Sequence, residues 1–597
     1  MSLSILTAVV LGLGLPALAL PSTQYPNIAT RLNTTNAYTV PAHDKNLTAR
    51  NEAIQVKRET FLYGPSIAGN TSFWPTGSLG NSTVQSQFAS LVADGNSQVA
   101  AVKNDSATAA QAVIAAGGIT KLSDFDRLYD GQWKNAIPDG LVSGILSNYT
   151  DDLLFSMERL SLNPYSIKRL NPTSDKLAFD IDESIALSIT GMTTQSLLAS
   201  GSLFYIDQRF QADLESTGRY AAACDAFFYI SSDTGDFLPL AVRTNVGENL
   251  IYTPLDLPND WLLAKIMFNL NDFWHSQFYH FAGTHMVAEI VYEAAYRTLS
   301  DSHPVLALLN RLTPQLFSYR QAALATLINK GGYVDNLFAY TGAAAAVTTT
   351  ILYNEMGAGN FQANYFLRNL ENRGLLNSSF GPELKSFPFY EDASAIHTSI
   401  TKFVSTFVDS YYPTTTSFES DNELQSWISE AIPAQILDFP TSMTRQTLIE
   451  IITHIAFLGS AAHQTLNTND VAEAMAVLPF HPVSLYAPPP TSKGVTDLIP
   501  FLPGVAASIG QISVTALFSR PTFLHSERSL TQMFNSVEML ARMPPGIKEA
   551  AETFTGEMMV QSGVVSSRGF DERGLCQGMP FKWKALDPQR APYYFTI

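Results

Sequence analysis

The longest helical pattern in the chain runs over residues 261–298 and has almost no polar face. It contains no proline and a single glycine, Gly283, and the residues Pro-Asn-Asp at 258–260 precede it as a helix-start signal. A helix of about 38 residues would measure roughly 55 Å at 1.5 Å per residue. Because a helix that is apolar on every side is buried, this segment is predicted to lie at the centre of a large domain.

Other stretches predict more helices and few strands. Apolar periodicity predicts helices at about 313–329, 334–356, 395–411, 422–433, 445–466 and 529–541. The runs FFYI and PLAV near 227–242 predict a small hairpin, and the proline-rich stretch 486–494 predicts a loop. We therefore predict a mainly α fold, with one large helical domain over 151–597 and few short strands. Residues 20–150, rich in small and polar residues in their first hundred, are predicted to pack on its surface.

Composition and charge exclude several classes of function. The chain has 53 acidic and 36 basic residues, a formal net charge of −17. This charge repels phosphate backbones, so nucleic-acid binding is excluded, as is purely electrostatic docking onto anionic lipid. No segment beyond the N-terminus offers roughly 18 uninterrupted apolar residues, so no transmembrane span is predicted.

The N-terminus predicts secretion. Residues 1–19 are apolar and end in Ala-Leu-Ala, as a cleaved signal peptide does, although no basic residue precedes them; the alternative is a membrane anchor. Glycosylation sequons occur at Asn33, Asn46, Asn70, Asn81, Asn104, Asn148 and Asn377. Cys224 and Cys576 are the only cysteines, and the sequence leaves open whether they pair. Without a Cys-x-x-Cys motif, zinc-ribbon and iron–sulfur sites lack their ligands.

Histidines carry the candidate chemistry. His275, His280, His285 and His303 fall within 29 residues, and His463 and Asn467 lie four apart further on. Residues five apart lie about 140° apart on an α-helix, so His280 and His285 can share an ion only across a π-bulge, for which Gly283 lowers the cost. One iron or manganese ion per chain suits this set of ligands, which offers three imidazoles, an amide oxygen and a terminal carboxylate but no thiolate. The alternative is a set of core histidines with satisfied hydrogen bonds.

The pattern His-x4-His-x4-His-x17-His, then Pro304, a distant His-x3-Asn and a terminal Ile, resembles the lipoxygenases. The flanking segments YTPLDLPNDWLLAK (252–265) and SDNELQSWISEAI (420–432) resemble the same family, so the resemblance covers roughly 235–597. It implies that the metal ligands are His280, His285, His463, Asn467 and the carboxylate of Ile597. It also implies that His275 and His303 orient these ligands or pack the core. The chain has many sequons and no strand pattern for an N-terminal β-barrel. In both respects it resembles the secreted fungal lipoxygenases, several of which use manganese.

Two positions depart from the family pattern. A family His-Gln pair is here His275-Ser276, with Gln277 one place later, and a common glutamine three residues after the ligand asparagine is here Asp470. Both departures alter the hydrogen bonds around the ligands. They leave the choice between manganese and iron open.

The resemblance implies a monomeric dioxygenase that takes linoleic or linolenic acid and O₂. A metal(III)-hydroxide would abstract hydrogen from the CH₂ between two cis double bonds, and O₂ would add to the radical. Ala323 matches the position where alanine accompanies S products. By the same match Leu327, Val334, Phe338 and Phe518 are expected in the substrate pocket, with core packing as the alternative for each. Arg520 is a candidate to bind the fatty-acid carboxylate, or else a surface arginine.

Three other functions remain open from the sequence. A family member devoted to hydroperoxide isomerisation would keep the same ligands and differ only in its products. A zinc hydrolase would need a catalytic carboxylate near the site, as in HExxH, and the sequence has no such motif. A non-enzymatic secreted glycoprotein would bind no metal.

Overall fold

One continuous hydrophobic core extends from Val40 to Phe595 in the computed structural model. The structure describes residues 37–64, 74–76, 82–130, 151–467, 478–518 and 526–596. A smaller cluster, which includes Leu170 and Phe227, packs on the far face of the sheet. The N-terminal region contributes to the same core as the helical region, through residues such as Phe61 and Val113.

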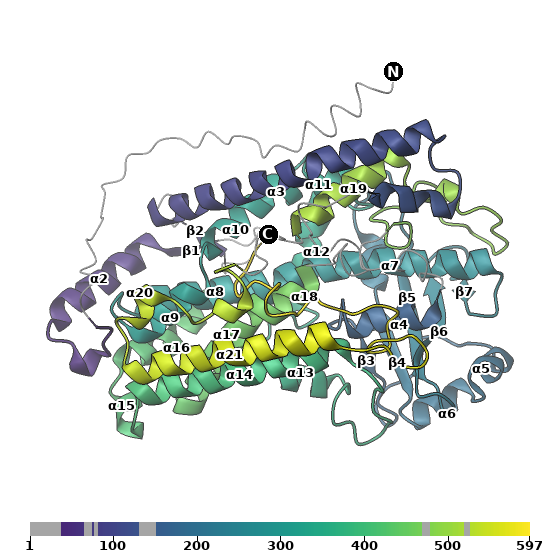
Figure 1. The fold of residues 1–597 in the computed structure, drawn as a ribbon. Helices are drawn as coiled ribbons and strands as arrows, with labels where there is room; N and C mark the ends of the chain where they lie inside the picture. Colours follow the sequence, from purple (N-terminus) through teal and green to yellow (C-terminus); the bar gives the residue numbers. More distant parts are fainter. Residues whose placement is uncertain are drawn as a thin grey trace.

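The predicted central helix is confirmed. Helix α7 (Pro258–His280) continues through a π-helical segment, Phe281–Met286, into α8 (Val287–Thr298). Pro258 occupies the first helical position, where its fixed φ suits the helix and its missing N–H costs nothing. Figure 1 shows this long helix crossing the middle of the molecule. Almost every residue of it is buried, as its apolar periphery predicts.

The other helices surround this axis. In Figure 1, α3 lies along the top of the molecule, and α14 and α21 run side by side along the bottom. Helices α10, α11, α12 and α19 lie between α3 and the central helix. Their bounds are α2 Leu47–Thr60, α3 Ser82–Ala115, α4 Asp152–Met157, α5 Glu183–Thr190, α6 Thr194–Ala199, α9 Pro304–Leu312, α10 Leu316–Ala323, α11 Tyr333–Leu337, α12 Gly342–Asn354, α13 Phe366–Asn372, α14 Pro388–Tyr411, α15 Thr415–Glu419, α16 Asn422–Ala434, α17 Arg445–Phe457, α18 His463–Asn467, α19 Val505–Phe518, α20 Val537–Leu540 and α21 Pro545–Ser567.

The predicted hairpin is confirmed and belongs to a larger sheet. Five antiparallel strands pair in the order β3-β4-β5-β6-β7, namely Lys168–Arg169, Leu203–Asp207, Cys224–Ile230, Phe237–Thr244 and Ile251–Tyr252. In the central pair Cys224 faces Thr244, and a bulge lies at Phe227 and Phe228. Strands β1 (Leu62–Gly64) and β2 (Trp74–Thr76) form a separate antiparallel pair. The sheet lies beside the N-terminal part of α7.

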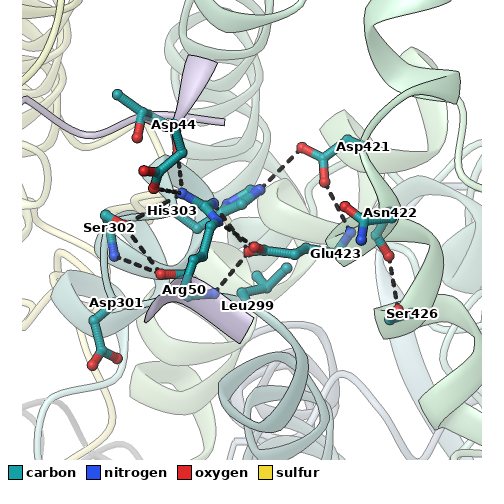
Figure 2. A network of polar contacts seen from close by, with 12 residues as sticks. Asp44, Arg50, Leu299, Asp301, Ser302, His303, Asp421, Asn422, Glu423 and Ser426 are labelled. Atoms are coloured by element: carbon teal, nitrogen blue, oxygen red, sulfur yellow. Dashed lines mark hydrogen bonds and ion pairs between the residues drawn. The ribbon is translucent and has the colours of Figure 1, made fainter. Parts of the chain in front are cut away.

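The N-terminal helix α2 is bound to the helical core through buried charges. Arg50, 4% exposed, donates from Nε and Nη2 to the carboxylate of Glu423 at the start of α16, and from Nη1 to Asp44. The same carboxylate accepts the backbone N–H of Ser300. Figure 2 shows this network closing around the loop that carries His303. The N-terminal region is therefore fixed to the end of α8 by directional bonds as well as by packing.

Three expectations about local structure need correction or completion. The segment 334–356 is two helices, α11 and α12, because Tyr340 bridges to Ser216 and the Thr341 side chain caps α12. The predicted helix at 529–541 is wrong: it contains only a 3₁₀ turn, Leu530–Gln532, and the four-residue α20. Cys224 and Cys576 are free, buried thiols and form no disulfide.

Candidate metal centre

Three buried histidines bring one ring nitrogen each within 4.8 Å of one another: His280, His285 and His463. Their ring centroids lie 4.8 Å apart for His280 and His285, 4.5 Å for His280 and His463, and 4.9 Å for His285 and His463. The Nε2 atoms of His285 and His463 face each other at 3.1 Å. This arrangement can surround one small cation with imidazole nitrogens.

A π-helical turn brings the first two histidines together. His280 ends α7 and His285 lies in the segment Phe281–Met286, so the predicted π-bulge is confirmed. Gly283 lies at its middle, and the structure shows a further reason for a glycine there. A Cβ at this position would lie 2.9 Å from Cε1 of Tyr279, so the missing side chain makes room for that ring.

A second π-helical segment precedes the other half of the centre, and the sequence did not predict it. It spans Leu458–Ala462, between α17 and the short α18 that begins at His463 and ends at Asn467. His463 is fully buried and Asn467 is 1% exposed. The Nε2 of Gln277 donates to the carbonyl of Leu466 at 3.2 Å, which joins α7 to α18 beside Asn467.

The polar atoms of this group suit a bound metal ion. Nε2 of His280 and both amide atoms of Asn467 are buried and have no hydrogen-bond partner among the described residues. Leaving such atoms unpaired costs free energy, which a ligand would offset. Burial lowers the pKa of His280 to about 3 and that of His285 well below its usual value. Both imidazoles are therefore neutral at pH 7, the form that binds a metal.

The C-terminal tail reaches the same centre. The Phe595 ring lies 5.4 Å from the ring of His285 and 5.7 Å from that of His463, between centroids. The N–H of Thr596 points at Nε2 of His463 at 3.4 Å. Ile597, the expected carboxylate ligand, follows Thr596 directly but lies outside the described residues.

An apolar cavity opens onto two of these histidines. It holds about 800 Å³ of space, counting its open mouth, and His280 and His285 line it together with Phe273, Phe278 and Tyr319. A cavity of this size and character suits an apolar ligand. Tyr319 and the glutamines Gln277 and Gln511 are the other side chains in its described lining with polar atoms.

Four of the expected pocket residues line this cavity: Ala323, Leu327, Val334 and Phe338. Ala323 ends α10, and Leu327 lies in a third π-helical segment, Leu324–Ile328, which the sequence did not predict either. Phe518 ends α19, whose residues Gln511 and Val514 line the cavity, but its side chain lies outside the described part. Arg520 and Asp470 lie outside the described residues.

The expected supporting residues occupy different places. Gln277 lines the cavity and holds α18, as described above. The Nδ1 of His275 lies 3.1 Å from the amide nitrogen of Asn163, and burial lowers the pKa of His275 to about 3. His303 caps α9 through Nδ1, and its Nε2 lies 3.2 Å from Asp421 (Figure 2). His303 thus belongs to the network around Arg50.

Several lining residues escaped the sequence analysis. Phe273 and Phe278 lie on α7 within the histidine run, where an all-round apolar pattern gives no sign of which side chains face a cavity. Val483 lies in a loop far along the chain and has no local signal at all. The spacing of Phe273 from His280 is a signal that could have found it, since residues seven apart share a helix face.

Comparison with known proteins decides the family. A family model described as Lipoxygenase matches residues 147–492. The chain is 45% identical over 569 residues to the manganese lipoxygenase of Colletotrichum gloeosporioides (strain Cg-14), which covers 94% of this chain and 93% of that protein. The chain belongs to the lipoxygenase family. The resemblance inferred from the histidine spacing is confirmed.

Other relatives agree with this assignment. The lipoxygenase described here is 45% identical over 582 residues to the manganese lipoxygenase of Fusarium oxysporum (strain Fo5176), covering 97% of this chain and 95% of that one. The solved manganese lipoxygenase of Gaeumannomyces graminis superposes with a TM-score of 0.90 at 42% identity, over 94% of this chain and 100% of that chain. A coral 8R-lipoxygenase, 20% identical with a TM-score of 0.76, shares the fold.

Membership of the family places the protein among the oxidoreductases. This lipoxygenase is an enzyme, a dioxygenase of fatty acids with a non-haem metal. No described helix combines the length and the apolarity that crossing a bilayer requires. The mainly α fold around a long helix with a π-bulge is likewise confirmed.

Proposed function

We propose that this chain is a secreted manganese lipoxygenase that converts linoleic or linolenic acid and O₂ into S-configured hydroperoxides. The observation that carries the proposal is the convergence of three buried imidazoles, two of which line one apolar cavity. Manganese is favoured over iron because relatives more than 40% identical over nearly the whole chain are named manganese lipoxygenases.

The metal would be held by His280, His285, His463, Asn467 and the carboxylate of Ile597. The neutral state of the first two histidines and the unpaired amide of Asn467 support this assignment. When bound, the ion would supply the one-electron oxidant that a hydrogen-atom abstraction requires. All three imidazoles are buried, which limits the access of water to the site.

The cavity residues would bind and orient the fatty acid. Phe273, Leu327 and Phe338 offer apolar surface for the acyl chain, and burial of that chain supplies binding free energy of about 25 cal/mol per Å². Ala323, 5% exposed on the cavity wall, is the residue that we propose to direct O₂ to the face that gives S products. Arg520 is proposed to bind the carboxylate, so Arg520→Ala should raise KM for free acids and leave methyl esters unaffected.

The proposal is tested by metal analysis of the purified protein together with conjugated-diene absorbance on linoleate. About one manganese per chain and diene formation are expected; zinc alone, or no metal, would overturn the proposal. His280→Ala should abolish both signals. A matched control is His397→Ala, which removes a partly buried imidazole that packs on Phe366 and Phe457 and should leave the metal bound. Consumption of hydroperoxide without diene formation would instead identify an isomerase.

The secreted location is a separate proposal. It is supported by the apolar residues 1–19 and by the exposure of two sequon asparagines, Asn46 and Asn377. Asn46 caps α2 through Oδ1, which leaves its Nδ2 free of the capping bond. Recovery of the full-length product from culture medium, with a mass that falls on endoglycosidase treatment, is the expected result. Retention inside the cells without sugar would contradict it.

A further inference from the structure

The two π-helical segments at the histidine cluster share one construction. Phe281–Met286 and Leu458–Ala462 contact each other, and each contains one glycine that lies beneath an aromatic ring. In the first, Gly283 makes room for Tyr279, a residue of the same helix. In the second, Gly459 makes room for Phe595, a residue more than a hundred positions later in the C-terminal tail.

The fit between Gly459 and Phe595 is close. A Cβ on Gly459 would lie 3.0 Å from Cε2 of Phe595 and 3.3 Å from Cδ2. Phe595 is fully buried, and its ring centroid lies 5.4 Å from that of His285 and 5.7 Å from that of His463. The ring therefore has little room to yield when an atom is added at position 459.

Phe595 also helps to position the residue that follows it. Thr596 follows it, and its backbone N–H points at Nε2 of His463. Ile597 follows Thr596 directly. Because the buried ring has little room to turn aside, a displacement of it would shift the backbone of Thr596 as well.

We propose that Gly459 and Phe595 form a positioning pair that sets the affinity of the histidine cluster for manganese. The pair does so by fixing the C-terminal backbone against His285 and His463. This inference rests on the proposed function, because it takes manganese as the ion bound there. Neither residue needs to touch the ion, since residues that orient ligands typically change metal affinity by about 10- to 100-fold.

The experiment measures manganese binding by the full-length protein rather than its turnover. The metal is removed with a chelator, Mn²⁺ is titrated back while the free ion is followed by electron paramagnetic resonance, and Tm is recorded without and with saturating Mn²⁺. Gly459→Ala and Phe595→Leu should each raise the Kd for Mn²⁺ by about 10- to 100-fold. Each should also reduce the rise in Tm that Mn²⁺ produces.

A double variant and a control separate positioning from packing. In Gly459→Ala/Phe595→Leu the smaller leucine makes room for the added methyl group. The rise in Kd of the double variant should therefore be smaller than the product of the rises in the two single variants. Gly556→Ala on the exposed face of α21, where a Cβ meets nothing within 4 Å, should leave Kd unchanged.

A wild-type Kd in both single variants, with equally lowered Tm in the metal-free and metal-bound states, would show packing alone and overturn the inference. A rise in Kd of the double variant equal to the product of the two single rises would also overturn the inference. If Gly459→Ala does not fold, Phe595→Leu decides in the same way. Absence of manganese binding by the wild-type protein would overturn the proposed function along with the pair, whereas normal binding by all variants overturns only the pair.

Discussion

Glu293 on α8 is a buried carboxyl group without a hydrogen-bond partner among the described residues. Burial raises its pKa well above the usual 4.5, and the nearby carboxylate of Glu289 raises it further, while Arg297 and Arg320 lower it. Glu430 on α16 also raises this pKa. The group is therefore protonated in the folded protein at pH values where the unfolded chain has lost the proton.

The sign of the pH dependence follows from this raised pKa. Folding takes up a proton at Glu293 above pH 4.5, so the free energy of unfolding falls as pH rises from 4.5 toward the folded pKa. The loss is about 1.4 kcal/mol for each pH unit. Glu293→Gln keeps the shape and cannot ionise. The unfolding free energy of the variant should therefore rise relative to that of the wild type by about 1.4 kcal/mol for each pH unit in this range.

The assay is urea unfolding followed by circular dichroism at several pH values between 4.5 and 8. The quantity to compare is the difference in unfolding free energy between Glu293→Gln and the wild type. Glu289, whose pKa is also raised, to about 7, contributes to both proteins. Its contribution cancels in the difference while Glu293 stays neutral in the wild type, because glutamine presents the same neutral neighbour. Glu552→Gln, at a side chain 63% exposed on α21, is the control and should show no such slope. A difference that stays constant with pH would refute the assignment of a protonated Glu293.

Three further predictions concern the site and its support. Ala323→Gly at the cavity wall should shift the hydroperoxide from S toward R, measured by chiral-phase chromatography; unchanged chirality would remove Ala323 from this role. One residue added after Ile597 should abolish bound manganese and turnover, whereas Ile597→Val, which keeps the terminal carboxylate, should retain both; full metal content in the extended protein would contradict a carboxylate ligand. Arg50→Ala should destabilise the fold by about 3–5 kcal/mol. The Glu423 carboxylate, 3% exposed, would still accept the Ser300 N–H but would lose the positive charge that neutralises it. A loss below about 1 kcal/mol in urea unfolding would show that this ion pair adds little.

Spacing made the first half of the metal centre predictable from the sequence. The separation of five between His280 and His285 is incompatible with one face of an α-helix, so it required the π-bulge that the structure contains. His463 and Asn467 carry no such signal, because a separation of four fits an ordinary helix. The π-helical segment before them, and the one that holds Leu327, arise from tertiary packing that no local pattern encodes.

Local composition also misled the prediction of several helices. Helix α3, 34 residues long, carries Ser, Thr, Asn and an internal glycine, all weak helix formers, and it lies in the region that was predicted only to pack on the surface of the helical domain. Its packing against α10 and α19 outweighs that weak propensity. The opposite error occurred at 334–356, where the apolar periodicity continues through a break at Tyr340, which bridges to another segment. Local patterns failed in both places because long-range contacts decided the backbone.

The π-helical turn at Phe281–Met286 also sets which face of α8 points at its neighbours. A π turn takes up one residue more than an α turn and leaves the following residues on the same faces of the helix. If the same residues formed a regular α-helix, α8 would be rotated by about 100° about its axis. That rotation would carry Arg297 away from Glu430 and Glu289 away from Arg320. The ion pairs downstream of the centre therefore favour the π turn, as the centre itself does.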